Sequence, residues 1–501
     1  MASFAGLIRP ALWVVTAKLS NAYSGSTGDS RKLSETLRIR FLVRRHSYAL
    51  EAELAFACRN IVCTAEVYDE TNGVVVDCGS STTRAGYAGE DTPEALFPSV
   101  VGFSTADAEG QARPETSNKR QKTSATIPST RKLRAGNAQL DYRHEGFEVE
   151  PVFQYGNFTS IEAVEALWEH AWRDRLRVNI EEHPVMMAEP VFQTKAAREQ
   201  LLEALFETHK APAAFMAKSA VLASYAMGRQ TSLMVDAGHN GTVVAAVHDG
   251  FVLKHSITQS CIGGSALSQC MLKSVEAKNI SVKPRFAFKR QETSPGHFEV
   301  QDVGLKGLTD SFCKFHVQQI AADIKESIGR VSDLPFSASE NANIPTVNYE
   351  LPDGNEIQIG PERFNVPEVL LQPSLLQSTF AGVVDTAAAQ GASPASLLDV
   401  IQDSISRSDV DVRRELYNSI LLTGGCSLFA TLRDRLEREL ADAAPQTAKV
   451  KVTSPANATE RRFAVWIGGS ILASLGSFQQ MWMSKKEYEE HGAALMHRKA
   501  P

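Results

Sequence analysis

The chain has no long hydrophobic run, no paired-cysteine motif and no strong excess of charge. Its longest apolar stretches, such as Ala11–Ala17, fall far short of the roughly 18 residues that a membrane-spanning helix needs, so we expect no integral membrane protein. The seven cysteines are an odd number and form no Cys-x-x-Cys pair. This argues against a disulfide framework or a structural zinc site, and favours a reducing compartment.

The net charge and the missing motifs exclude two further classes. A net charge of −6 with a pI of about 6.1 excludes a chain that coats nucleic acid by bulk charge, although a local basic patch remains open. No Gly-x-x-x-x-Gly-Lys-Ser/Thr loop is present, so a P-loop NTPase is excluded. The length of 501 residues predicts two or three structural lobes at roughly 100–200 residues per domain.

The first 68 residues are unlike the rest of the chain. Residues 1–50 carry eight basic side chains against two acidic ones, Asp29 and Glu35. The basic residues are Arg9, Lys18, Arg31, Lys32, Arg38, Arg40, Arg44 and Arg45. This composition is typical of an organellar transit peptide, but an unstructured extension or an incorrectly assigned start fits the downstream sequence better. We expect 1–68 to be an atypical extension and 69–501 to be the folded domain.

The composition of two segments of the folded domain indicates that they are insertions. Residues 104–139 are rich in Ser, Thr, Lys, Arg and Gly and have few side chains to bury, which predicts a disordered basic loop. Within it, Asn118–Lys122 is either a nuclear-import signal or a solvated basic loop. A second Ala/Ser/Gln-rich stretch, 378–408, predicts a shorter surface insertion with helical character.

Elsewhere strands alternate with helices, and one pattern occurs twice. Residues 73–77 (GVVVD) predict a buried strand that enters an Asp-x-Gly turn and returns as a hairpin over 83–89. Residues 232–236 (SLMVD) and 242–248 repeat the pattern. The repeat indicates an α/β fold built from two related halves around a cleft. Thr159–Glu162 (TSIE) predicts a capping box that opens a helix with apolar positions three and four residues apart.

The repeated turns have a chemical interpretation. Asp-x-Gly turns present backbone N–H groups on a concave surface that can hold phosphate oxygens, and glycine allows the anion to approach the backbone. The aspartates that end the two strands, Asp77 and Asp236, would supply hard oxygen atoms for a hydrated Mg²⁺ or Ca²⁺. A third glycine turn follows the strand before Gly424-Gly425.

From about residue 72 to its end, the chain resembles actin and the actin-related proteins. The segments that carry the resemblance are GVVVDCGSSTTRAGYAGEDTPEALFPSVVG (73–102), EEHPVMMAEPVFQTKAAREQLLEALFET (181–208), YELPDGNEIQIGPERFNVPEVLLQPSLL (349–376), DVRRELYNSILLTGG (411–425) and WIGGSILASLGSFQQMWMSKKEYEEHG (466–492). The resemblance implies the actin-like α/β fold, which sugar kinases and heat-shock chaperone ATPases share, with ATP in the cleft between two similar lobes. An insertion-like segment at 457–463 (NATERRF) favours a nuclear subgroup of the family.

The family's nucleotide-binding residues transfer position by position, and the resemblance alone assigns their roles. Arg84 stands where actin has a lysine that reaches the phosphates, and Arg462 lies at the far wall of the adenine pocket. The predicted ATP-binding residues are Asp77, Gly79, Ser80, Arg84, Asp236, Gly238, Gly264, Lys325, Glu326, Gly424, Gly425, Phe429 and Arg462. The metal, Mg²⁺ or Ca²⁺, would be held through water by Asp77 and Asp236.

The family's catalytic positions depart from its pattern. Where actin holds the attacking water with a glutamine, a histidine and an aspartate, this chain has Ser219, Val243 and His239. A serine is too short to reach the water and valine has no polar atom, so we expect negligible hydrolysis. ATP would then be a structural ligand that stabilises the fold by mass action.

Three classes of function compete. The resemblance favours a non-catalytic subunit of chromatin-remodelling and histone acetyltransferase complexes in the nucleus. Such a subunit pairs with nuclear actin on a helicase-SANT-associated helix, with contact to histones or nucleosomes open. The predicted cleft for that helix comprises residues 85–87, 472–478 and Met481. A filament-forming ATPase is disfavoured by Ser219 and the loop at 104–139, and a sugar-kinase relative by the lack of a further catalytic aspartate motif.

Overall fold

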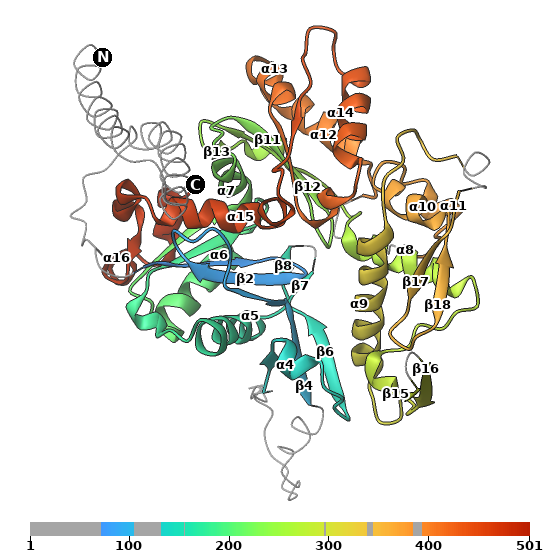
Figure 1. Cartoon of the computed structure of the whole chain (residues 1–501). Coiled ribbons are helices and arrows are strands. Elements are labelled where there is room, and N and C mark those ends of the chain that lie inside the picture. Colours follow the sequence, from blue (N-terminus) through green and yellow to red (C-terminus); the bar gives the residue numbers. More distant parts are fainter. Residues whose placement is uncertain (1–71, 105–131, 155, 295–296, 338–343, 384–392) are drawn as a thin grey trace, which may run out of the picture. The chain divides into compact units, whose positions relative to one another are not determined.

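The structure is a computed structural model of the whole chain. It describes residues 72–104, 132–154, 156–294, 297–337, 344–383 and 393–501 (Figure 1). By its internal contacts the chain divides into Met1–Cys58 and Arg59–Pro501, and every described residue belongs to the second unit. The predicted extension 1–68 and the predicted import signal at 118–122 therefore lie outside the described residues.

A six-stranded sheet forms the first lobe. Its order is β21 (Met483–Ser484), β10 (Ala213–Lys218), β9 (Val185–Glu189), β1 (Val74–Cys78), β2 (Thr82–Tyr87) and β3 (Ala95–Pro98). Strand β1 lies parallel to β9 and antiparallel to β2. Its three valines are completely buried, as a run of β-branched residues in a central strand predicts. The predicted strand and hairpin at 73–89 are confirmed.

A second six-stranded sheet forms the second lobe and repeats this plan. Its order is β13 (Phe251–Val252), β12 (Thr242–His248), β11 (Ser232–Ala237), β19 (Ile420–Thr423) and β20 (Val452–Thr453), and β14 (Thr258–Ser260) also pairs with β12. Strand β11 is antiparallel to β12 and parallel to β19, as β1 is to β2 and β9. The two related α/β halves predicted from the sequence are therefore present.

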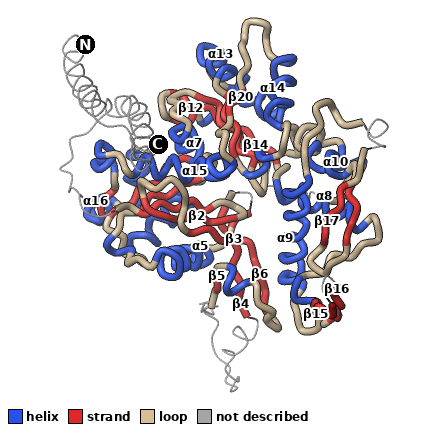
Figure 2. The backbone as a smooth tube through the Cα atoms, viewed as in Figure 1, coloured by secondary structure: helices blue, strands red, loops and turns tan. Residues whose placement is uncertain are grey.

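Helices α7 (Ser219–Ala226) and α15 (Ala458–Ala473) carry the chain between the lobes and pack against each other (Figures 1 and 2). Their approach is close, since a Cβ on Gly468 would lie 1.8 Å from the Leu222 carbonyl oxygen. Trp466 of α15 is buried and donates its indole N–H to the Val75 carbonyl of β1 at 3.0 Å. The two crossings thus form one packed unit against the first sheet.

The helix that the sequence predicts after Thr159 has a different N-terminal cap in the structure. Helix α5 (Ile161–Glu169) has Ser160 as its N-cap, and the Ser160 hydroxyl accepts the Ala163 N–H at 3.1 Å. The Thr159 hydroxyl donates instead to the Val152 carbonyl. With Ser160 as the cap, the third helical residue is Ala163, which has no carboxylate to return the bond, so the predicted capping box is wrong.

A small sheet extends from the first lobe and corrects one predicted insertion. It consists of β5 (Arg134–Ala135), β4 (Val100–Ser104) and β6 (Phe147–Pro151), and helix α4 (Asn137–Leu140) follows β5. Residues 132–139 are thus ordered, because Ala135 and Leu140 supply buried apolar contacts. The prediction of a disordered loop is wrong for that part, and 105–131 lie outside the described residues. The hairpin β7 (Phe153–Gln154) and β8 (Asn157–Phe158) follows.

The second lobe corrects the other predicted insertion. Helix α12 (Leu397–Arg407) begins with a capping box between Ser396 and Asp399, and it packs on β12 and β14. Its side chains Leu397, Val400 and Ile401 are buried in the core of the lobe. The predicted helical character is confirmed for 397–407. The predicted surface position is wrong for these residues, because their apolar side chains repeat at helical spacing and face the core. Residues 384–392 lie outside the described residues.

The remaining elements complete both lobes. Those of the first lobe are the π-helical turns His170–Leu176 and Ala204–Thr208, the 3₁₀ turns Ile180–Glu182, Gly476–Met481 and Ala493–Leu495, and helices α6 (Lys195–Glu203), α16 (Lys485–His491) and α17 (Met496–Lys499). Those of the second are helices α8 (Gly264–Glu276), α9 (Asp310–Ile328), α10 (Glu362–Glu368), α11 (Leu375–Ser378), α13 (Val410–Asn418) and α14 (Leu432–Ala443), the hairpins β15 (Phe288–Ser294) with β16 (His297–Asp302) and β17 (Val347–Glu350) with β18 (Glu356–Ile359), and the 3₁₀ turns Lys254–Ser256, Arg285–Ala287 and Gly425–Leu428.

Candidate functional site

One cavity of about 560 Å³ lies between the two lobes. Its size falls within the roughly 300–1,000 Å³ that small-molecule sites occupy. All sixteen positions singled out from the sequence line it: Asp77, Gly79, Ser80, Arg84, Ser219, Asp236, Gly238, His239, Val243, Gly264, Lys325, Glu326, Gly424, Gly425, Phe429 and Arg462. The structure therefore brings together residues that are up to 385 positions apart (462 − 77) in the chain.

Each lobe contributes the same tight turn. After β1 the Gly79 N–H donates to the Thr82 carbonyl at 3.1 Å, and after β11 the Gly238 N–H donates to the Gly241 carbonyl at 3.0 Å. A Cβ at Gly79 or Gly238 would lie 3.0 or 3.1 Å from the oxygen that accepts this bond. Glycine thus lets each turn close, and the two turns form the opposing walls that the sequence repeat predicted.

Arg84 is directed differently from the family expectation. It faces Asp77 across the β1–β2 hairpin, and its Nη1 donates to the Asp77 carboxylate. Its guanidinium also lies 5.4 Å from the centre of the Phe463 ring. The Nε–H group is buried and has no hydrogen-bond partner among the described residues. Arg84 therefore neutralises Asp77 and keeps one buried donor free for an anion.

Asp236 is the electrostatically perturbed group of the cavity. Burial raises the pKa of its carboxyl to about 6, Arg84 opposes that shift and the neighbouring charge of Asp77 adds to it. Residue Val243 stands opposite Asp236 across the β11–β12 hairpin, so no basic side chain faces it in register. The pair of acidic groups at the two strand ends thus carries a repulsion that a bound cation would relieve.

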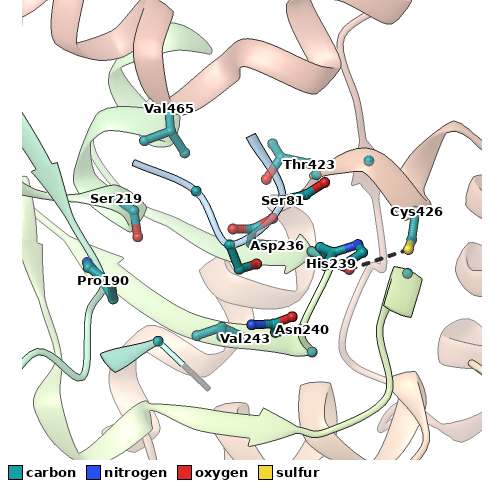
Figure 3. A pocket seen from close by; sticks show the side chains of 18 of the residues that line it. Ser81, Pro190, Ser219, Asp236, His239, Asn240, Val243, Thr423, Cys426 and Val465 are labelled. Carbon is teal, nitrogen blue, oxygen red and sulfur yellow. Dashed lines mark hydrogen bonds between the residues drawn. The ribbon is translucent and has the colours of Figure 1, made fainter. Parts of the chain in front are cut away.

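The third glycine turn closes against Asp236. Gly424 has φ +88, and a Cβ there would lie 2.4 Å from the Asp236 Oδ1. Cys426, two residues on, points its thiol at the Gly238 carbonyl at 3.4 Å (Figure 3). Gly425 has open space around its Cα. The turn after β19 therefore needs glycine at 424 but not at 425.

Helix α9 supplies the predicted pair Lys325 and Glu326. The Lys325 ammonium is buried and donates to the Gly264 carbonyl at 3.1 Å and to the Ser268 hydroxyl at 3.0 Å. It therefore ties the C-terminal part of α9 to the start of α8. The Glu326 carboxylate lies 4.0 Å from that ammonium and is largely exposed.

The three residues that the sequence analysis matched to the family's catalytic positions lie around Asp236. Ser219 is the first residue of α7, Val243 lies on β12, and His239 lies in the turn after β11 (Figure 3). Burial, with a further contribution from the Lys325 ammonium, lowers the pKa of His239 to about 4. The imidazole is therefore neutral at pH 7 and binds protons too weakly to serve as an effective base.

The described residues do not form a three-ligand metal centre. Within the ranges given above, no group of three or more His, Cys, Asp or Glu side chains is arranged to hold a metal ion. Asp77 and Asp236 remain a two-carboxylate pair, which suits a cation that keeps most of its water or binds together with an anionic ligand.

Several lining residues were missed by sequence reasoning. They are Ser81, Glu189, Asn240, Thr423, Cys426 and Arg461 among others. Asn240 donates its amide to the Phe153 carbonyl of the other lobe at 3.0 Å. Asn240 could have been predicted to line the cavity, because it lies between Gly238 and Gly241 in the repeated turn. Glu189 had no comparable motif, because its position depends on β9 lying beside β1.

Glu189 belongs to a buried cluster of charges beside the cavity. Arg198 donates both Nε and Nη2 to its carboxylate, and the Lys218 ammonium lies 3.0 Å away. Burial lowers the pKa of Lys218, and Glu189 opposes that shift. Arg198 also donates to the Ala500 carbonyl at 2.6 Å. The cluster thus fixes the end of the chain against the first lobe.

The predicted docking cleft for a helix is partly core. Ala85, Leu472 and Phe478 are buried in the first lobe. Tyr87, Leu475 and Met481 are only partly buried against that core. Strand β2, helix α15 and the 3₁₀ turn Gly476–Met481 direct the first three inward, so these three side chains offer little surface for a contact.

In the parts of the chain that the structure describes, no helix is both long and apolar enough to cross a bilayer.

Comparisons with known proteins agree with the geometry. The profile of the family described as Actin matches residues 68–501. A protein named actin-related protein 4 from Oryza sativa subsp. indica is 47% identical over 445 residues, which cover 86% of this chain and 99% of the relative. The protein of that name from Arabidopsis thaliana is 46% identical over 439 residues, with 86% and 99% covered. That from Mycosarcoma maydis is 30% identical over 524 residues, with 86% and 98% covered. The resemblance stated from the sequence, and the fold that it implied, are confirmed.

Proposed function

The chain belongs to the actin family, and on that premise we propose that it binds ATP between its lobes and hydrolyses it negligibly. The observation that carries the proposal is the pair of matching glycine turns, Gly79 with Thr82 and Gly238 with Gly241, on opposite walls of one cavity. Backbone N–H groups in such turns bind phosphate oxygens without sequence-specific side chains. The cavity volume and the free Arg84 Nε–H support the same ligand.

Different residues of the cavity would hold different parts of ATP. The two turns and Ser80 would hold the phosphates, while the third turn, Phe429 and Arg462 would line the adenine side. Asp77 and Asp236 would hold a hydrated Mg²⁺ or Ca²⁺. Bound ATP supplies negative charge to both turns at once and so links the lobes. It stabilises the folded chain by mass action, which at a hundred times the dissociation constant amounts to about 2.7 kcal/mol.

Negligible hydrolysis follows from the three replaced side chains. General-base and positioning groups each contribute typically about 10²–10⁴ to a rate. The Ser219 hydroxyl is short, the Val243 side chain has no polar atom, and the low pKa of His239 leaves it a weak base at pH 7. ATP would therefore serve as a structural ligand.

We further propose that the chain is a non-catalytic subunit of nuclear chromatin-remodelling and histone acetyltransferase complexes. It would pair with nuclear actin on a helicase-SANT-associated helix and contribute to nucleosome or histone contact. Support comes from the similarity to proteins named actin-related protein 4 over 98–99% of their length. Of the predicted docking residues, Tyr87, Leu475 and Met481 keep exposed surface that a helix could cover.

Nucleotide content and turnover test the first proposal. Protein purified without added nucleotide should release adenine nucleotide on denaturation, and ATP should remain intact over hours in a single-turnover assay. Actin-like turnover, or failure to bind ATP at all, would overturn it.

For the second proposal, affinity purification from nuclear extract should recover actin and a Swi/Snf-type motor. Sedimentation of the pure chain in polymerising salt would favour a filament-forming ATPase instead.

A further inference from the structure

One residue of the second lobe has a backbone conformation that its side chain disfavours. Thr431 lies just before α14 with φ +67 and ψ −11, in the left-handed region. Among the non-glycine residues with positive φ in the described part of the chain, it is the β-branched one. A β-branched residue is an outlier there, and such outliers persist only where surrounding contacts hold them, often beside a ligand site. The contacts of Thr431 therefore indicate its role.

The Thr431 hydroxyl is not used in the way that its position predicts. Thr431 is the N-cap of α14, and Asp434 stands at the third helical position, as in a capping box. Its side chain nevertheless caps no N–H of the helix. The hydroxyl instead reaches the carbonyl of Val331, a residue 100 positions earlier, and lies 2.6 Å from the Ala430 carbonyl. The usual helix cap is thus replaced by a contact with a distant segment.

The distant segment is the one that follows helix α9. The Val331 N–H donates to the Ala430 carbonyl at 3.1 Å, and Arg330 forms a parallel β-bridge with Ala430. With the bond from the Thr431 hydroxyl to the Val331 carbonyl, the two segments exchange a donor in each direction. We call residues 330–331 and 430–431 the clip. Val331 is completely buried, so the clip is anchored in the core of the second lobe.

A buried arginine continues the clip along α14. Arg435 lies one turn beyond Thr431 and donates to the Ser332 carbonyl at 2.8 Å. It also donates to the Glu368 carboxylate at 3.1 Å, and both partners are at most 2% exposed. Helix α14 is therefore fixed to the segment after α9, and the Thr431 bond is the link of this series nearest to the cavity.

The clip borders the wall that would take the base of the nucleotide. Phe429 and Gly329 stand one residue before its two segments, and both line the cavity. A Cβ on Gly329 would lie 2.9 Å from Cε1 of the Phe429 ring, so the ring rests directly on the glycine. Lys325 and Glu326, in the last turn of α9, line the same cavity. The place of the Phe429 ring relative to the end of α9 thus depends on the clip.

An aromatic ring contributes to base binding according to the surface that it shares with the base. A purine has two fused rings and shares more of that surface than the single ring of a pyrimidine. If the ring loses its fixed place, a purine therefore loses more binding energy than a pyrimidine does. A ring that is held in position favours the larger base.

We propose that Thr431 is a positioning residue for the base. Its left-handed backbone and its bond to Val331 hold the Phe429 ring against Gly329, and the cavity thereby favours a purine over a pyrimidine nucleotide. Thr431 does not itself line the cavity, so it acts through Phe429. The inference rests on the proposed ATP binding and adds the residue that sets base selectivity.

Displacement of a fluorescent ATP analogue by ATP and by CTP, in Mg²⁺ buffer, measures this selectivity. Thr431→Val removes the hydroxyl and keeps the shape of the side chain. We expect it to weaken ATP binding about tenfold and CTP binding less than about threefold. Thr431→Ser keeps the hydroxyl and should leave the ATP-to-CTP ratio within about twofold of the unmodified chain. Thr431→Gly relieves the disfavoured φ but lacks the hydroxyl, so it should lose selectivity while remaining more stable than Thr431→Val.

Ser484→Ala is the matched control. It removes the hydroxyl that caps α16 in the first lobe. It should lower the urea midpoint of unfolding and leave the ATP-to-CTP ratio unchanged. An unchanged ratio in Thr431→Val, with ATP still bound, would overturn the inference. A ratio that falls equally in Ser484→Ala would overturn it too, because selectivity would then follow stability alone.

Hydrogen exchange of the nucleotide-free protein separates this inference from the proposed function. A peptide covering 329–334 should be protected, since the Val331 amide is bonded to Ala430. Protection should fall in Thr431→Val and persist in Ser484→Ala. No protection in the unmodified chain would overturn the clip. Protection lost in Thr431→Val with an unchanged ratio would refute base selection and leave ATP binding intact. A protected chain that binds neither ATP nor CTP would instead refute the proposed function, and base selection with it.

Discussion

The two turns that face each other across the cavity have the same backbone and different electrostatics. In the first, Asp77 stands opposite Arg84 in the hairpin register and is paired with it. In the second, Asp236 stands opposite Val243, and burial raises the pKa of its carboxyl to about 6. The residue opposite each aspartate on the return strand thus differs, a paired arginine for Asp77 and an apolar valine for Asp236, whose pKa is raised chiefly by burial. Two halves with the same backbone plan therefore differ in the charge that they present to the cavity.

The strongest test removes the space beside Asp236. Gly424→Ala places a methyl group 2.4 Å from the Asp236 Oδ1 and keeps a backbone φ of +88 that alanine disfavours. We expect at least about a hundredfold weaker ATP binding, measured by fluorescence titration. Gly425→Ala is the control, because nothing lies within 4 Å of its added Cβ, and it should bind within about threefold of the unmodified chain. Equal loss in both variants would show that the turn, rather than Asp236, governs binding.

The next test makes the first turn resemble the second. Arg84→Met leaves Asp77 buried without its partner, which should lower the free energy of unfolding by about 3 kcal/mol in urea denaturation. Arg173→Met is the control, since its ion pair with Glu169 is exposed and worth about 0–1 kcal/mol. A loss in Arg84→Met no larger than in the control would mean that the Asp77–Arg84 pair does not distinguish the two turns.

The pH dependence of binding tests the second turn directly. Asp236 is mainly protonated below pH 6 and ionised above it. Binding of ATP with Mg²⁺ should strengthen about tenfold from pH 5 to 7, whereas binding without metal should weaken, because the new carboxylate attracts the cation and repels the anion. In the nucleotide-free protein the folded state binds more protons than the unfolded chain, so stability falls as the pH rises from about 4 to 6.

Asp236→Asn is the control for that experiment. In this variant, the pH dependence of ATP binding should no longer differ between the curve with Mg²⁺ and the curve without it. Both curves should still show the protonation of ATP itself. His239 does not titrate in this range, since its pKa is lowered to about 4. Parallel curves with and without Mg²⁺ in the unmodified chain would contradict the assignment of Asp236 as the cation-facing group.

The smallest expected effect comes from giving Asp236 a partner. Val243→His puts an imidazole opposite it in register and, when protonated, should lower the pKa of the carboxyl by about one unit. The midpoint of the Mg²⁺-dependent binding curve should move down accordingly, with hydrolysis still negligible. Phe251→His on the neighbouring strand β13 is the control and should leave the midpoint in place. An unchanged midpoint in Val243→His would mean that the residue opposite Asp236 does not set its charge.

Much of the cavity could be predicted from the sequence because its residues sit in continuous motifs. The valine run of β1 and the Asp-x-Gly turn after it determine both the strand and the place of Gly79. The second turn follows by repetition. The direction of Arg84 could not be predicted, since the family lysine suggested a phosphate contact and the hairpin register gives it Asp77. Glu189 and Cys426 reach the cavity only because β9 and β19 lie beside β1 and β11.

The segments at 104–139 and 378–408 show where composition misleads. Both are rich in small and polar residues, yet Leu140 beside the first and Leu397 and Ile401 within the second are buried. A few apolar side chains at the right spacing suffice to order a short helix once a partner surface is present. The average composition of a segment does not show whether such a partner surface is present.

The order of neighbouring residues was enough to define the strands and the three glycine turns. Only the tertiary structure decided that Asp77 is neutralised while Asp236 is not, and that Phe147 meets Phe312 across the lobes. The physical reason is that turns and strands depend on neighbouring residues, whereas a carboxyl pKa and a buried ring contact depend on what distant segments bring within a few ångströms.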